Sequence, residues 1–148
     1  MAIDRMASAT WSGELRGGRG RISTGSKVLS DAPYSFGTRF ESAPGTNPEE
    51  LIAAAHAACF SMAFANVIAG KGLKPREIET RATCSLEAQG GGFKITCMRL
   101  ETRGEVPGID AARFKELAKE AEAACPISNA LRAGLQIELI ATLDDYSR

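Results

Sequence analysis

Residues 45–62 read Gly-Thr-Asn-Pro-Glu-Glu-Leu-Ile-Ala-Ala-Ala-His-Ala-Ala-Cys-Phe-Ser-Met, and this stretch predicts a central helix of the fold. Asn47 suits the N-cap, Pro48 suits the first helical position, and the two glutamates that follow favour the helix dipole. The helix is expected to run to about Ala69, because a glycine follows directly and ends it. Its middle carries almost no charge, so we expect it to be buried on most sides.

Short strands are expected before this helix. Thr10–Glu14 and Arg21–Thr24 flank a glycine-rich turn, which is typical of a hairpin. Pro33–Glu41 alternates with a period of two, so it is expected to be a strand with aromatic side chains on one face. Arg39 then points to the opposite face, at the edge of a strand.

A strand pair and a second helix are expected after the central helix. Glu77–Ala88 and Phe93–Val106 flank a run of glycines and form the clearest hairpin of the sequence. Asp110 caps a helix that runs to about Ala124, and Pro126 starts a break or a new short helix. A final strand, Leu135–Leu143, is followed by a polar tail. This order of elements predicts an α+β protein.

Length and composition fit one ordinary globular domain spanning residues 1–148. The sequence has 18 basic and 18 acidic residues, so its net charge of zero supports neither nucleic acid nor an anionic membrane surface as a partner. No uninterrupted apolar run is as long as a membrane span, and the N-terminus lacks the apolar core of a signal peptide. We therefore expect a cytoplasmic protein whose cysteines are reduced.

The four cysteines differ in their surroundings. Cys59 lies in the middle of an apolar helix stripe, where it is either an inert core residue or a reactive thiol. Cys125 precedes a proline that can open a helix, and backbone N–H groups at a helix start lower the pKa of a thiol, so it is either a structural or a reactive cysteine. Cys84 and Cys97 lie on predicted strands, which favours structural roles. With no C-x-x-C pair and one histidine, a structural zinc site is not expected.

A reactive cysteine needs a cation, because the thiolate is the nucleophile and an adjacent positive charge favours it. Arg39 could supply that charge, and Glu49, in the first turn of the central helix, could hold the guanidinium in place. Ordinary readings also exist, since Arg39 could be a solvated strand residue and Glu49 a residue that favours the helix dipole. His56 lies three residues before Cys59, where it either pairs with the thiol or packs through a hydrogen bond.

The 45–62 segment resembles the hallmark segment of the OsmC/Ohr family, and the OsmC branch most closely. Three further segments match in the same order along the chain: 33–41, 106–110 and 124–128. The resemblance implies an OsmC-like α+β fold, with antiparallel sheets wrapped around two central helices. It also implies an intertwined homodimer with active sites at the subunit interface.

The same resemblance implies the site residues and the reaction. Cys59 corresponds to the peroxidatic cysteine, Cys125 to the resolving cysteine, and Glu49 to the glutamate that holds the activating arginine. That arginine is Arg39 by comparison with the OsmC branch and Arg19 by comparison with the Ohr branch. Cys59 is then expected to reduce organic hydroperoxides through a sulfenic acid, and hydrogen peroxide more weakly.

The implied cycle continues with a Cys59–Cys125 disulfide, which an external dithiol of the lipoyl type reduces. No metal, haem or flavin is implied. Two alternatives of other classes stay open from the residues. One is a binding module that kept the fold and lost most of the chemistry. The other is an acyl-transfer or hydrolytic enzyme that uses Cys59 and His56.

Overall fold

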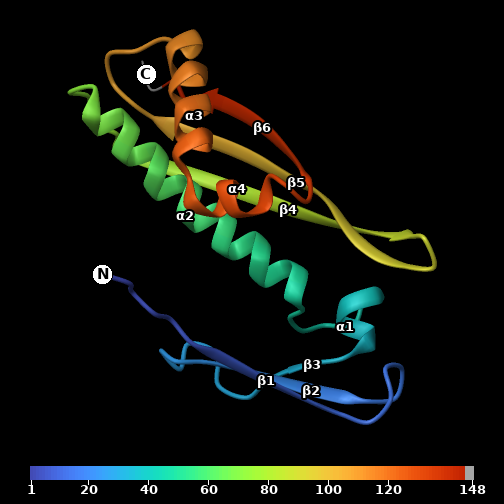
Figure 1. Cartoon of the computed structure of the whole chain (residues 1–148). Coiled ribbons are helices and arrows are strands. Elements are labelled where there is room, and N and C mark those ends of the chain that lie inside the picture. The colour runs from blue at the N-terminus through green and yellow to red at the C-terminus, as the bar shows by residue number, and fades with distance from the viewer. Residues whose placement is uncertain (146–148) are drawn as a thin grey trace. The chain divides into compact units, whose positions relative to one another are not determined.

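The computed structural model describes residues 1–145 and shows an α+β chain (Figure 1). The chain divides into two compact units, one spanning Met1–Leu51 and the other beginning at Ile52. The single domain expected from the sequence stays a prediction. The polar tail expected over Asp144–Arg148 extends beyond the described residues, since 146–148 lie outside them.

The first unit contains a three-stranded antiparallel sheet in the order β1 (Ala7–Ser12), β2 (Arg19–Thr24), β3 (Ala32–Tyr34). The expected N-terminal hairpin is confirmed, although β1 and β2 both begin earlier than predicted. Gly20 lies opposite Tyr34, and a Cβ atom at Gly20 would come within 2.2 Å of the tyrosine ring. Glycine is required there because the aromatic ring packs directly against the backbone of β2.

The strand predicted over Pro33–Glu41 is wrong beyond Tyr34, because the chain forms a short helix, α1 (Phe36–Phe40). Ser35 and Thr38 make a capping box that starts this helix. The Thr38 N–H donates to Ser35 Oγ at 3.3 Å, and the Ser35 N–H donates to Thr38 Oγ1 at 2.9 Å. These local hydrogen bonds override the two-residue alternation, so Arg39 lies on a helix and not at a strand edge.

Helix α2 (Pro48–Gly70) confirms the prediction made from its start signals. Asn47 caps it through Oδ1, which accepts a hydrogen bond from the Glu50 N–H at 2.8 Å. One side of α2 is buried, but Met62 on another side is 76% exposed. The expectation that α2 is buried on most sides is therefore wrong for the single chain. By length and composition alone, α2 could also cross a membrane.

The second unit contains a three-stranded sheet in the order β4 (Glu77–Gln89), β5 (Gly92–Glu105), β6 (Gln136–Leu143). Strands β4 and β5 are antiparallel and confirm the predicted hairpin. Strand β6 runs parallel to β5, a pairing that the expected antiparallel sheets did not include. Two helices connect β5 to β6 and return the chain along the length of β5. Strand β6 therefore enters the sheet in the same direction as β5, which makes the pair parallel.

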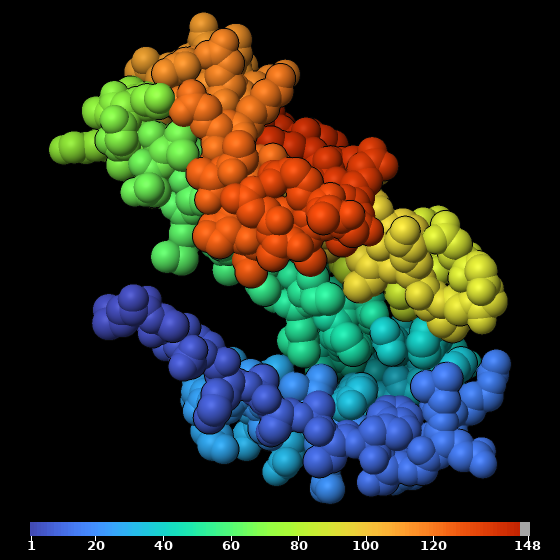
Figure 2. Space-filling model, in the orientation of Figure 1, coloured from blue at the N-terminus to red at the C-terminus, as the bar shows by residue number. Residues whose placement is uncertain are grey.

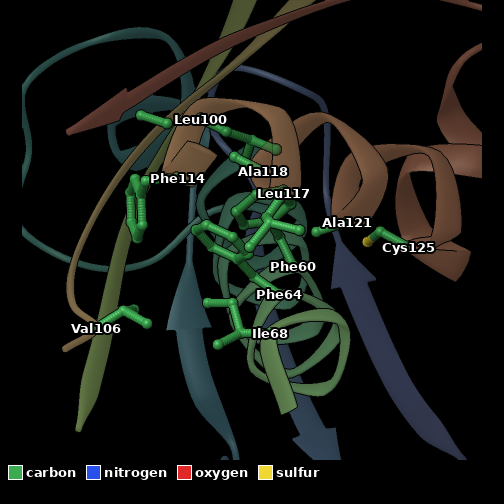
Figure 3. Packing of buried hydrophobic residues seen from close by; sticks show 11 residues of the cluster. Phe60, Phe64, Ile68, Leu100, Val106, Phe114, Leu117, Ala118, Ala121 and Cys125 are labelled. Atoms are coloured by element: carbon green, nitrogen blue, oxygen red, sulfur yellow. The ribbon is translucent and has the colours of Figure 1, made fainter. Parts of the chain in front are cut away.

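Helix α3 (Ala111–Ala124) and helix α4 (Pro126–Leu131) form this connection. Asp110 caps α3 as predicted, because its carboxylate accepts a hydrogen bond from the Arg113 N–H at 2.8 Å. In the space-filling view the orange atoms of α3 and α4 cover part of the green helix α2 (Figure 2). The core of this unit lies where α2, α3 and the sheet meet, and Cys125 closes one edge of it (Figure 3). Its largest buried side chains are Phe60, Phe64, Ile68, Leu100, Phe114 and Leu117.

Candidate active site

Two cysteines that are far apart in the sequence meet in the second unit. Cys59, on α2, and Cys125, between α3 and α4, lie close enough for the Cys125 side chain to change the pKa of the Cys59 thiol. Neither forms a disulfide in this structure, and Cys59 is partly exposed whereas Cys125 is fully buried. Small solutes therefore reach Cys59 more readily than Cys125. The structure brings together the two sulfur atoms that the sequence singled out.

The protonation of Cys59 depends on three groups around its sulfur. Burial raises the pKa of the Cys59 thiol, and this is the largest effect. A hydrogen bond from the Ile127 backbone N–H lowers this pKa, because it stabilises the thiolate. The hydrogen bond and the charge of Cys125 raise the Cys59 pKa further. Within the second unit alone, the thiol form of Cys59 is therefore favoured.

Cys125 forms the corner between two helices. It ends α3 and caps α4, and its extended backbone (φ −68°, ψ 117°) turns the chain there. Pro126 at the start of α4 favours this break. The Ser128 N–H donates a hydrogen bond to Cys125 Sγ at 3.5 Å, in the manner of an N-cap. Two neighbouring residues of α4 thus serve one sulfur atom each. The Ile127 N–H donates to Cys59, and the Ser128 N–H donates to Cys125.

Arg39 and Glu49 form an ion pair within the first unit. The Nε atom of Arg39 donates to both carboxylate oxygens of Glu49 at 3.2 and 3.3 Å, and Nη2 donates to Oε1 at 2.8 Å. Glu49 is buried, whereas the side chain of Arg39 is 36% exposed. The other arginine that the sequence offered, Arg19, is exposed on β2 opposite Ser12. The pair predicted from the sequence is therefore made by Arg39.

An aromatic cavity of about 200 Å³ lies beside Arg39 in the first unit. Two pairs of rings border it, with centroids 5.4 Å apart for Trp11 and Tyr34 and 4.8 Å apart for Phe36 and Phe40. Sequence reasoning missed this cavity, because its walls come from β1, the following turn, β3 and α1. A larger cavity of about 520 Å³ in the second unit contains none of the cysteines.

His56 is fully buried in the second unit, and its Nε2 atom lies 2.7 Å from Ser128 Oγ. Within residues 1–145, its Nδ1 atom has no hydrogen-bond partner. Burial lowers the pKa of His56, the charge of Glu122 raises it, and the charge of Arg132 lowers it. Sequence reasoning expected a hydrogen-bonded packing role for His56 but missed Ser128. The sequence offered only a weak sign of a role for Ser128. It lies three residues after Cys125, which caps a helix that begins with a proline.

The other two cysteines lie on the hairpin of the second unit. Cys84 pairs with Met98 across the strands, and Cys97 pairs with Ser85. Burial raises the pKa of Cys97, and the nearby charge of Glu138 adds to this rise. Among the residues that the structure describes, no group of three or more His, Cys, Asp or Glu is placed to hold a metal ion.

The architecture matches solved proteins of the OsmC/Ohr type. The OhrB protein of Bacillus subtilis aligns with a TM-score of 0.71 at 28% identity, over 92% of this chain and 97% of that protein. An organic hydroperoxide resistance protein from Elizabethkingia anophelis aligns with a TM-score of 0.73 at 26% identity, over 97% and 100% of the two chains. Residues 40–140 also match the family model described as OsmC-like protein. The chain therefore belongs to the OsmC-like family, as its sequence motifs predicted.

Two curated relatives make this placement more specific. The protein named Peroxiredoxin OsmC from Escherichia coli (strain K12) is 46% identical over 138 residues, which cover 93% of this chain and 96% of that protein. The Organic hydroperoxide resistance protein from Xanthomonas axonopodis pv. citri (strain 306) is 39% identical over 127 residues, which cover 83% and 87%. The higher identity and wider coverage of the first relative agree with the OsmC branch that the sequence resembled.

Proposed function

We propose that this protein is a thiol-dependent peroxidase that reduces organic hydroperoxides, and more weakly hydrogen peroxide. The observation that carries the proposal is the proximity of the Cys59 and Cys125 side chains, since Cys59 packs against the core cluster that contains Cys125 and the two thiols affect each other electrostatically. Thiols in contact can form a disulfide with little movement of the backbone, so they can store the oxidising equivalent that a peroxide delivers. Relatives named peroxiredoxin and organic hydroperoxide resistance protein support the same chemistry.

In the proposed reaction the Cys59 thiolate attacks the terminal peroxide oxygen. The O–O bond breaks, the alkoxide leaves and takes a proton to become the alcohol, and Cys59 becomes a sulfenic acid. The Cys125 sulfur then attacks the Cys59 sulfur, which forms the disulfide and releases water. An external dithiol, of the lipoyl type or similar, returns two electrons by thiol–disulfide exchange.

The first step needs a cation beside Cys59, because burial raises the pKa of that thiol. Arg39 is the proposed cation, and Glu49 fixes its orientation through the ion pair. We assign the guanidinium at each Cys59 to the partner subunit of a homodimer, because the resemblance to the OsmC/Ohr family implies active sites at the subunit interface.

One face of α2 is exposed in the single chain, and this uncovered face supports the homodimer. It combines the small residues Ala54 and Ala58 with Met62, so a second helix could approach it closely. A membrane is a less suitable cover, because the opposite side of α2 builds the protein core through Phe60 and Phe64. The proposed protein is a soluble, cytoplasmic homodimer in which a second copy covers this face.

The aromatic cavity beside Arg39 supports the preference for organic hydroperoxides. Its walls include Trp11, Tyr34 and Phe36, which offer apolar surface to a hydrocarbon chain. Hydrogen peroxide has no such chain and gains nothing from these contacts. Because Arg39 borders the cavity, an alkyl group bound there would leave its peroxide group near the guanidinium.

Oxidation of cysteine variants with an alkyl hydroperoxide tests the proposal. The wild type should lose both thiols of the pair and show a Cys59–Cys125 disulfide by mass spectrometry. Cys59→Ser should abolish turnover, and Cys125→Ser should complete one turnover and stall with Cys59 oxidised. Cys84→Ser is the matched control and should retain turnover. A catalytically weak binding module would show no peroxide-dependent loss of thiols in any variant, and that result would overturn the proposal.

A further inference from the structure

A buried contact beside the two cysteines has no role in the steps described above. His56 Nε2 and Ser128 Oγ are 2.7 Å apart, and both residues are 0% exposed. His56 precedes Cys59 by three residues on α2, and Ser128 follows Cys125 by three residues. Residues three apart on a helix lie one above the other on the same face. The histidine–serine contact therefore runs beside the cysteine–cysteine contact, one helical turn away.

Two side-by-side contacts constrain more than one contact does. The proximity of Cys59 and Cys125 alone leaves α4 free to rotate against α2, whereas the added contact between His56 and Ser128 limits that rotation. Ser128 takes part in both contacts, because its backbone N–H donates to Cys125 Sγ while its hydroxyl group meets His56. A shift of Ser128 would therefore move the hydrogen bond that holds the Cys125 sulfur.

The chemistry of His56 argues against a role in packing alone. Within the described part of the chain, Nδ1 is buried without a partner, and a buried polar atom without a hydrogen bond destabilises a folded protein. An apolar side chain of similar size would fill the space without that penalty. Burial lowers the pKa of His56 and so favours the neutral ring, although the charge of Glu122 opposes this effect. A ring proton on Nε2 leaves only a lone pair unmet at Nδ1, so we assign the Nε2–H group as the donor to Ser128 Oγ.

We propose that His56 and Ser128 are positioning residues that hold Cys125 in line with the Cys59 sulfur for disulfide formation. This inference rests on the proposed function. In the step concerned, the S–OH bond of the Cys59 sulfenic acid breaks and the S–S bond to Cys125 forms. The hydroxide released takes the Cys125 proton and leaves as water, so no further reactant is needed. Neither positioning residue exchanges a proton or an electron in this step.

Stopped-flow oxidation by an alkyl hydroperoxide separates sulfenic acid formation from disulfide formation and tests the inference. Ser128→Ala and His56→Leu should each slow disulfide formation about threefold to tenfold, the range expected for one net hydrogen bond. Both should leave the rate constant of sulfenic acid formation within about twofold of the wild-type value, because Cys125 contributes no reacting atom to that step. Ser128→Thr keeps the hydroxyl group and should restore the rate of disulfide formation.

A double-mutant comparison and a matched control separate positioning from general destabilisation. His56→Leu combined with Ser128→Ala should be no slower than either single variant, because the two residues act through one bond. Thr102→Val removes another buried hydroxyl group of the second unit and should not change the rate of disulfide formation. A partly unfolded sample lowers the amplitudes of both phases, whereas loss of positioning lowers one rate constant. Equal slowing of both steps, or additive effects in the double variant, would overturn the inference.

A measurement without peroxide distinguishes this inference from the proposed function. In glutathione redox buffers at a fixed concentration of reduced glutathione, Ser128→Ala should need about fivefold more oxidised glutathione than the wild type to form the disulfide. This shift would support the positioning role even if the wild type failed to reduce peroxides, a failure that would overturn the peroxidase proposal alone. An unchanged redox equilibrium together with an unchanged rate of disulfide formation would overturn the positioning role alone.

Discussion

The carboxylate of Glu49 holds the guanidinium of Arg39 through two nitrogen atoms, Nε and Nη2. Burial of Glu49 makes this pairing necessary, because an ionised carboxylate away from water must be compensated by charge and hydrogen bonds. The exposed part of Arg39 is then fixed in direction and available to another group. The ion pair thus converts a flexible arginine into an oriented donor.

Arg39→Ala should raise the pKa of Cys59 by about one unit or more, because it removes the cation that favours the thiolate. Reaction with an alkylating reagent over a range of pH, with mass-spectrometric detection at Cys59, measures this shift. Arg19→Ala is the control and should leave the titration of Cys59 unchanged. The opposite pattern would transfer the activating role to Arg19.

Subunit complementation tests the origin of the guanidinium. Cys59→Ser chains and Arg39→Ala chains should each be nearly inactive as separate proteins. If the guanidinium comes from the partner subunit, a mixed dimer regains one complete site, and random mixing should restore about a quarter of the wild-type peroxidase activity. Activity that stays at the level of the separate variants would instead place both groups of a site in one chain.

Met62→Arg should prevent self-association, because it puts a charge on the uncovered apolar face of α2. Analytical ultracentrifugation should find a dimer for the wild type and a monomer for the variant. Val28→Arg makes the same change at an 84% exposed residue between β2 and β3, and should remain dimeric. A monomeric wild type would contradict the proposed assembly.

Stability should fall in mild acid because of His56. Burial lowers the pKa of His56 in the folded state, so the unfolded chain, with an ordinary pKa near 6.5, binds the proton first. The free energy of unfolding should therefore decrease as the pH falls from about 6.5 toward the lower folded-state pKa, by at most about 1.4 kcal/mol per pH unit for this proton. Urea unfolding at several pH values measures the slope, and His56→Leu should flatten it. An equally steep slope in the variant would assign the effect to other groups.

Phe36→Ala should reduce discrimination between peroxides, because it removes apolar surface from the cavity beside Arg39. The value of kcat/KM for an aromatic alkyl hydroperoxide should fall about tenfold, whereas that for hydrogen peroxide should change little. Phe93→Ala removes an exposed ring from the β4–β5 hairpin and serves as the matched control. An equal loss of kcat/KM for both peroxides would indicate general damage to the active site, and would contradict a role of Phe36 in substrate selection.

The elements that the sequence predicted well have strong local signals. Asn47 and Pro48 mark the start of α2, Asp110 marks the start of α3, and the glycines between β4 and β5 mark a turn. The helix over Phe36–Phe40 was missed because the aromatic alternation pointed to a strand. In that segment the capping box at Ser35 decided the structure.

The site was predictable only in part, because its residues are joined by non-local contacts. Family motifs pointed to the two cysteines and to Glu49, and the structure adds that Arg39, not Arg19, is bonded to that glutamate. The hydrogen bond between His56 and Ser128 joins positions 72 residues apart, and no local sequence pattern predicts it. The parallel pairing of β5 with β6 likewise depends on the path of the intervening helices.

The sulfur of Cys125 is both a proposed reagent and the atom that terminates a helix. As a thiol it accepts the Ser128 N–H and completes the first turn of α4. In the proposed cycle the same atom is drawn into a covalent bond with Cys59, so the acceptor of the Ser128 N–H must move when the disulfide forms. The redox state of the cysteine pair would then be coupled to the backbone geometry at the start of α4, because one sulfur serves both the disulfide and the helix cap.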